Sequence, residues 1–97
     1  MPIFIILGNL TQDGVKGIKN LPKRQKMAEE LTESIGGKIL SLYYTFGQYD
    51  WVGVVEAPSI ESAMKSLFMF GMEGASRTNT LVAITAEEAV KMVKEIP

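Results

Sequence analysis

The sequence predicts an α+β domain in which two helices cover one face of a four-stranded antiparallel sheet. Three observations lead to this fold class. The chain has 97 residues, a size at which one domain with one hydrophobic core is the rule. Four short segments show the apolar runs or the period-two alternation of strands, and three others show the spacing of amphipathic helices. These segments alternate along the chain in the order strand, helix, strand, strand, helix, strand, helix.

The first part of the chain predicts a strand followed by a helix. Residues 3–10 form an apolar run rich in β-branched side chains, which is typical of a central strand buried on both faces. Residues 11–21 contain two glycines and no sustained period, so we expect a long loop there. From Pro22, apolar residues recur every four positions until Gly36-Gly37, which indicates a helix that ends at a glycine cap.

The next segment, residues 38–46, alternates strictly and predicts a second strand. The alternation places Leu42 and Tyr44 on the face of the core. It places Ile39 and Tyr43 on the opposite face, away from the core.

The second half of the chain predicts the remaining four elements. Residues 47–50 are turn formers and residues 51–56 resume an apolar run, so we expect an antiparallel hairpin. Ser59 is a good N-cap for a second helix that ends near Gly74. The apolar stripe of that helix consists of Ile60, Ala63, Met64, Leu67, Phe68 and Gly71. Residues 78–84 read as a fourth strand, and a capping box from Thr85 to Glu88 opens a last helix with Ala89, Val90, Val93 and Ile96 on its apolar face.

The order of the elements is the ferredoxin-like βαββαβ arrangement with an extra C-terminal helix. Two right-handed crossovers place both main helices on the same face of the sheet. No internal repeat or composition change divides the chain, so residues 1–97 are predicted to form a single domain.

The strands also predict that the protein is a homo-oligomer, a dimer or a higher assembly. In a monomer of this fold the sheet face without helices should be polar. Here the first strand is apolar at every position from Ile3 to Leu7, and the third strand has Val52 and Val54 on one side with Trp51 and Val55 on the other. Contiguous apolar patches are rare on monomers. We therefore expect a second copy to cover the open face of the sheet.

The composition excludes several classes of chemistry. The chain has no cysteine and no histidine, which removes disulfides, thiolate nucleophiles, imidazole bases and the usual zinc, copper and haem ligands. The acidic residues are dispersed, so we expect no metal site and no cofactor.

The charge and the N-terminal apolar run bear on partners and location. The net charge of −1 supplies no field for nucleic acid, and we interpret the basic residues between Lys16 and Lys26 as solvated surface. A nucleic-acid partner is therefore not expected. The apolar run stops at Gly8, which is too short for a signal sequence or a membrane span, so we expect a cytoplasmic location and no membrane partner.

The segment from Tyr43 to Pro58 contains Gly47-Gln48-Tyr49-Asp50 between two strands. It resembles the signature of the GYD domain family, which is named for a Gly-x-Tyr-Asp segment. The resemblance extends over nearly the whole chain and includes residues 11–14, Gly36-Gly37 and residues 77–83. It implies a ferredoxin-like fold that associates through its sheet, as dimeric α/β barrels do. It implies no particular chemistry.

Four side chains are candidates for a binding site over the open sheet face. Tyr43 projects from that face, and Tyr49 and Asp50 lie in the hairpin, where they are either a hydrogen-bond donor and a base or residues that fix the turn. Arg77 is either an anion ligand or a member of an ion pair. The hairpin and the start of the fourth strand are expected to approach the same end of the sheet.

These candidates support two classes of function. The first is an oligomer that binds a small molecule in a pocket over the sheet. The alternative is a cofactor-independent enzyme of the dimeric α/β barrel kind, with Asp50 as the base and Tyr43 or Tyr49 as the acid. The sequence does not decide whether the protein is an enzyme.

Overall fold

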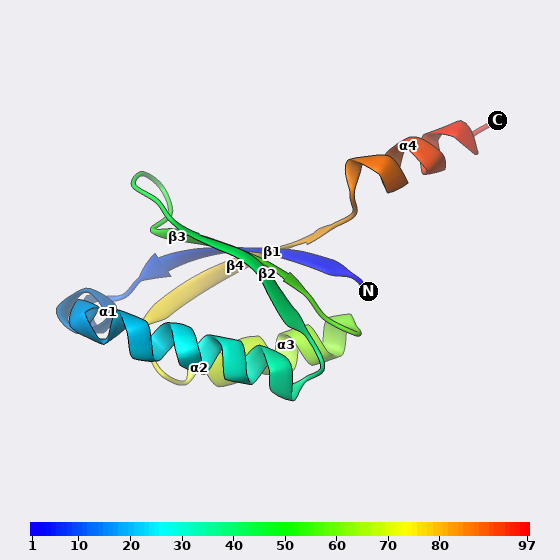
Figure 1. Cartoon of the computed structure of the whole chain (residues 1–97). Helices are drawn as coiled ribbons and strands as arrows, with labels where there is room; N and C mark the ends of the chain where they lie inside the picture. Colours follow the sequence, from blue (N-terminus) through cyan, green and yellow to red (C-terminus); the bar gives the residue numbers. More distant parts are fainter.

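The computed structural model describes all residues from Met1 to Pro97. A four-stranded sheet forms one layer, and the helices before β2 and after β3 form a second layer on one of its faces (Figure 1). The main elements are β1 (Ile3–Leu10), α2 (Leu21–Ser34), β2 (Lys38–Tyr44), β3 (Trp51–Glu56), α3 (Ile60–Gly71), β4 (Ser76–Ala83) and α4 (Ala86–Lys94).

The strand order in the sheet is β2-β3-β1-β4, and all neighbouring strands are antiparallel. β1 is therefore a central strand, as its apolar run predicted. This topology, with α2 and α3 on one face, is the ferredoxin-like fold, so the predicted fold class is confirmed.

The segment between β1 and α2 differs from the long loop that the sequence predicted. It contains a short helix α1 (Gln12–Lys16) and a 3₁₀ turn η1 (Ile18–Asn20). The hydroxyl of Thr11 accepts a hydrogen bond from the amide of Gly14 at 3.1 Å and caps α1. Helices this short have no apolar period, which is why the sequence pattern did not reveal them.

β2 also departs from the strict alternation that the sequence predicted. The pairing with β3 shifts between Ile39 and Ser41, so that Leu40 is an extra residue. Ile39 consequently lies opposite Val55 and packs toward the helices, and its predicted place beside Tyr43 is wrong. From Ser41 onward the alternation holds.

Helices α3 and α4 begin where the sequence placed their caps. Ser59 and Ser62 form a reciprocal capping box at the start of α3, and the hydroxyl of Thr85 accepts from the amide of Glu88 at 3.1 Å at the start of α4. Gly36 has a φ of 79° at the end of α2, a left-handed conformation that suits glycine.

The apolar stripe of α3 is rotated relative to the prediction. Ala63, Leu67 and Phe70 pack against the sheet, whereas Met64 and Phe68 lie on the exposed side of the helix. The sequence placed Met64 and Phe68 in the core, and this is wrong. The apolar arc of α3 is wider than the surface that contacts the sheet, so the period alone does not determine which edge of the arc is buried.

Trp51 is the centre of the core. Its ring packs edge-on against Phe70 with the ring centroids 5.9 Å apart, and its Nε1 donates a hydrogen bond to Ser76 Oγ at 3.1 Å. The ring lies across Gly8, where an added Cβ would be 2.0 Å from Cε2 of Trp51. Gly8 is therefore required by the close approach of this ring.

The core is small for a chain of this length. Only 12 of the 97 residues are buried, and no large side chain is fully buried. Much of the apolar surface of the protein must therefore lie outside the core.

α4 takes no part in that core. It stands clear of the body beyond the end of β4, on the other side of the sheet from α2 and α3 in the view of Figure 1. Its apolar side chains Val90, Val93 and Ile96 are exposed. The helix leaves the open face of the sheet uncovered.

Candidate functional site

The open face is the surface of the sheet that is turned away from α2 and α3. Because residues opposite each other in antiparallel strands share a face, the register defines its members. Ile5 lies between Val54 and Leu81, and Leu7 lies between Val52 and Asn79. The open face comprises Ile3, Ile5, Leu7, Asn9, Lys38, Ser41, Tyr43, Val52, Val54, Glu56, Arg77, Asn79, Leu81 and Ala83.

Tyr43 lies at the β2 edge of the open face, opposite Val52, with 63% of its surface exposed. Most of its ring is therefore uncovered within the chain. Its hydroxyl is free to contact a ligand or a second copy of the chain.

The hairpin between β2 and β3 carries Tyr49 over the open face. Gly47 has a φ of 135°, and the hydroxyl of Thr45 donates to the carbonyl of Tyr49 at 2.6 Å, which fixes the shape of the loop. The hydroxyl of Tyr49 accepts a hydrogen bond from Nδ2 of Asn79 at 3.3 Å. Tyr49 thus joins the hairpin to β4 at the far side of the sheet.

Asp50 attaches the hairpin to the central strand. Its Oδ2 accepts from the amide of Leu10 at 2.8 Å, and its own amide donates to the carbonyl of Gly8 at 2.8 Å. These bonds cap the end of β1 where the ladder with β3 stops. The turn-fixing interpretation of Asp50 therefore has a structural basis in this geometry.

Arg77 is exposed near the start of β4, opposite Asn9. It lines an open polar hollow together with Thr11, Gly74 and Thr78. The register places it at the same end of the sheet as the hairpin, next to the row that contains Asn79.

The four predicted residues thus lie at one end of the sheet, but each has a different setting. Tyr43 and Tyr49 are at the open face, and Asp50 is bound to the backbone of β1. Arg77 lies opposite Asn9 on the open face and also lines a hollow beside the loop that follows α3. Their role in binding stays a prediction. The sequence interpretation missed Asn79, which its alternation with Leu81 along β4 could have placed on the open face.

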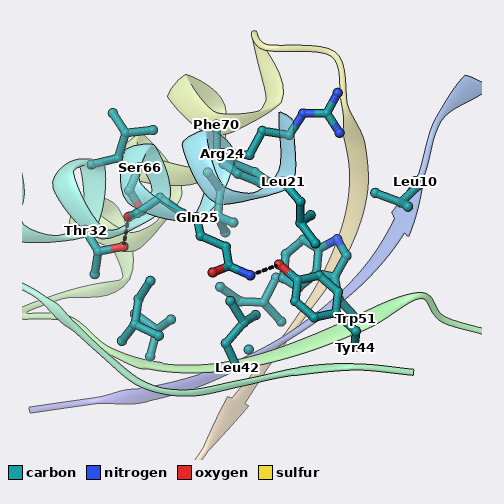
Figure 2. A pocket seen from close by; sticks show the side chains of 17 residues that line it. Leu10, Leu21, Arg24, Gln25, Thr32, Leu42, Tyr44, Trp51, Ser66 and Phe70 are labelled. Carbon is teal, nitrogen blue, oxygen red and sulfur yellow. Dashed lines mark hydrogen bonds between the residues drawn. The ribbon is translucent and has the colours of Figure 1, made fainter. Parts of the chain in front are cut away.

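A cavity of about 100 Å³ lies on the other side of the sheet, between the sheet, α2 and α3 (Figure 2). Twelve of its 17 lining residues are hydrophobic. Near Tyr44, Nε2 of Gln25 donates a solvent-exposed hydrogen bond to the tyrosine hydroxyl at 2.7 Å. None of the four predicted site residues lines this cavity.

Comparison with known families decides the membership of the chain. The model of the GYD domain family matches residues 4–93. The chain belongs to the GYD domain family. This confirms the resemblance that the Gly47-Gln48-Tyr49-Asp50 segment suggested.

The chain is similar to several known proteins. It is 33% identical over 95 residues to the "glutamine synthetase and cystathionine beta-lyase binding protein" of Thermus thermophilus, and the match covers 97% of this chain and 100% of that protein. A crystal structure of a protein from Thermus thermophilus has a TM-score of 0.55 at 19% identity, and the match covers 89% of this chain and 96% of that one.

The feast or famine regulatory protein of M. tuberculosis, in complex with L-methionine, has a TM-score of 0.66 at 15% identity. The match covers 89% of the GYD domain and 52% of that chain, so the domain spans about half the length of that regulator. At these identities the two structures establish the fold.

The signature residues of the GYD domain have distinct structural tasks. Gly47 adopts a backbone conformation that other residues avoid, Tyr49 reaches across the sheet to Asn79, and Asp50 holds the hairpin to β1. No group of three or more acidic side chains in the GYD domain is arranged to hold a metal ion. None of its helices is both long and apolar enough to span a bilayer.

Proposed function

We propose that the protein is an oligomeric binding module whose copies pair through the open face and hold a small molecule between the paired sheets. The open face is the observation that carries this proposal. It combines a central apolar patch, formed by Ile5, Leu7, Val52, Val54 and Leu81, with polar side chains at one end.

The apolar patch favours pairing of two copies. Leu81 is 51% exposed and stands in one row with Ile5 and Val54, so a continuous apolar strip crosses three strands. Burial of such a strip stabilises an assembly by roughly 25 cal/mol for each Å² removed from water. Two sheets pack about 10 Å apart, which brings the strips of two copies into contact.

The polar end of the face supplies the groups that would orient a ligand. The hydroxyls of Tyr43 and Tyr49 and the amide of Asn79 lie at this end, and Arg77 is near its rim. Asp50 contributes by holding the loop that carries Tyr49, and its Oδ1 remains a further acceptor. A ligand with an apolar body and one polar group would fit this division.

The similar protein from Thermus thermophilus supports a binding role, because its name refers to the binding of two enzymes. The alternative, an enzyme with Asp50 as the base, is less well supported by the geometry. One oxygen of that carboxylate is committed to the amide of Leu10, and its task in the fold is already accounted for.

Two substitutions on adjacent positions of β4 test the assembly. Leu81 lies on the open face, whereas Val82 points to the other side and is 65% exposed. Light scattering of the unmodified protein should give at least twice the chain mass of 10.7 kDa. Leu81→Glu should give a monomer, and Val82→Glu should leave the assembly intact. A monomeric unmodified protein, or equal effects of the two substitutions, would contradict the proposed pairing.

The same samples test the ligand. Native mass spectrometry of protein purified without additives should detect a bound small molecule in the unmodified protein and in Val82→Glu. Leu81→Glu and Tyr43→Phe should lose it. Retention of the same molecule by the Leu81→Glu monomer would place the ligand elsewhere.

A further inference from the structure

The cavity between the sheet, α2 and α3 is separate from the open face. We propose that it is a second binding site, which takes a small, neutral, mainly apolar molecule with one hydroxyl or amide group. This inference does not depend on the pairing of copies, because all of its walls come from one chain.

The size and the lining of the cavity indicate the class of ligand. Its volume is about 100 Å³. An engineered apolar cavity of roughly 150 Å³ remains dry and binds benzene, so this smaller cavity suits a molecule no larger than a single six-membered ring. The hydroxyls of Thr32 and Ser66 donate to carbonyls of their own helices, at 2.8 Å to Ala28 and 2.8 Å to Ala63. The walls therefore present few free polar groups.

Gly53 is the second observation that points to a ligand. It lies on the cavity floor in β3, a strand paired on both sides, where glycine is unfavourable. A Cβ added there would be 3.6 Å from Trp51 and 3.8 Å from Leu42, which are ordinary contact distances. Packing within the chain thus does not require glycine at this position. A glycine within a strand marks a bulge, a bend, or a place where a ligand or another backbone approaches closely. The position of Gly53 on the cavity floor favours the ligand among these.

The solvent-exposed edge of the cavity, near Tyr44, supplies one polar anchor. Gln25 on α2 and the hydroxyl of Tyr44 at the end of β2 are joined by their hydrogen bond, which leaves the O–H of Tyr44 as a donor and Oε1 of Gln25 as an acceptor for a ligand. Arg24 is the charged residue of the lining, but its Nη1 donates to the carbonyl of Gly14 at 2.9 Å. With that guanidinium directed to α1, a neutral ligand fits better than an anion.

Trp51 provides the measurement, because it lines the cavity and is the single tryptophan of the chain. Cyclohexanol is a suitable probe, since it is neutral, has a six-membered ring and does not absorb where tryptophan does. Titration should give a saturable change in Trp51 fluorescence with a dissociation constant of about 1 mM. Amide shifts in NMR spectra should be confined to α2, α3 and the strands that they cover.

Variants with added volume test the location. Ala28→Leu fills the cavity from α2, and Gly53→Ala adds a methyl group to its floor without a clash. Each should weaken cyclohexanol binding, Ala28→Leu by at least about tenfold. Tyr44→Phe should weaken cyclohexanol but not benzene, because only the alcohol uses the polar anchor. Ser41→Ala removes a hydroxyl from the open face instead, so it is the matched control and should change neither.

Two results would overturn the proposal. One is a fluorescence response that does not saturate. The other is a folded Gly53→Ala protein, with thermal unfolding at or above that of the unmodified protein, that binds cyclohexanol with undiminished affinity. The Leu81→Glu protein should bind cyclohexanol normally, so failure of the open-face proposal and failure of this one are distinguishable.

Discussion

The two faces of the sheet use similar side chains for different purposes. On the helix face, Trp51 and Val55 are buried against α2 and α3. The indole ring occupies the space that a side chain at Gly8 would need. On the open face, Val52 and Val54 from the same strand are only partly buried, and no helix lies over them. The comparison shows that apolar residues on both sides of a strand predict burial of both faces of the sheet. The helices of this chain cover only one of those faces.

A glycine on the helix face should give the largest effect. Gly8→Ala places a Cβ 2.0 Å from the ring of Trp51, so the ring or β1 must move, and the free energy of unfolding should fall by about 3 kcal/mol. Chemical denaturation measures this loss. Gly53→Ala, on the same face, is the control and should not destabilise the protein, since its Cβ is 3.6 Å from Trp51. Equal losses would mean that the helix face is not packed as described.

The hairpin that overhangs the open face should give an intermediate effect. Asp50→Ala leaves the amide of Leu10 without its partner and should cost about 2 kcal/mol. Asp50→Asn keeps an acceptor at the same place and should cost less than about 1 kcal/mol. If Asp50→Asn leaves stability intact but abolishes ligand binding, the carboxylate itself contacts the ligand. If both variants are neutral to stability, the hairpin is held by other contacts.

The smallest effect is expected at the tip of that hairpin. Gly47 has no atom within 4 Å of an added Cβ, but its φ of 135° is unfavourable for other residues, so Gly47→Ala should destabilise by about 1 kcal/mol. Gly71 likewise has free space around it and lies in a helix with ordinary dihedrals. Gly71→Ala should therefore be neutral or slightly stabilising. Because both positions have free space for a Cβ, a difference in thermal unfolding between the two variants measures the backbone strain at Gly47.

The fold was predictable from the sequence because each main element carries its own local signal. The alternation in β2, the cap at Ser59 and the glycine at position 36 are read within a few residues, and their order fixes the topology. The bulge at Leu40 and the rotation of α3 were not predictable in this way, because each is decided by what packs on the other side.

The candidate site was predictable only in part. The sequence placed Tyr43 on the open face, and the structure agrees, because alternation resumes after the bulge. The hydrogen bonds from the amide of Leu10 to Asp50 and from Asn79 to Tyr49 join residues 40 and 30 positions apart. Such contacts have no local signature. The cavity under α2 was missed for the same reason, although the glycine in β3 was a visible signal.

The position of α4 has a consequence for how firmly the parts of the chain hold together. Only Ile84 and Thr85 connect it to β4, and two residues span about 7 Å at most, so the helix is tethered at the end of the sheet remote from the hairpin. A helix of nine residues without packing opens at almost no free-energy cost. Its amide hydrogens would then exchange with solvent long before those of β1, unless another copy covers it. Protection of the α4 amides from hydrogen exchange therefore reports whether another copy covers this helix. This measurement does not depend on any change in the sheet.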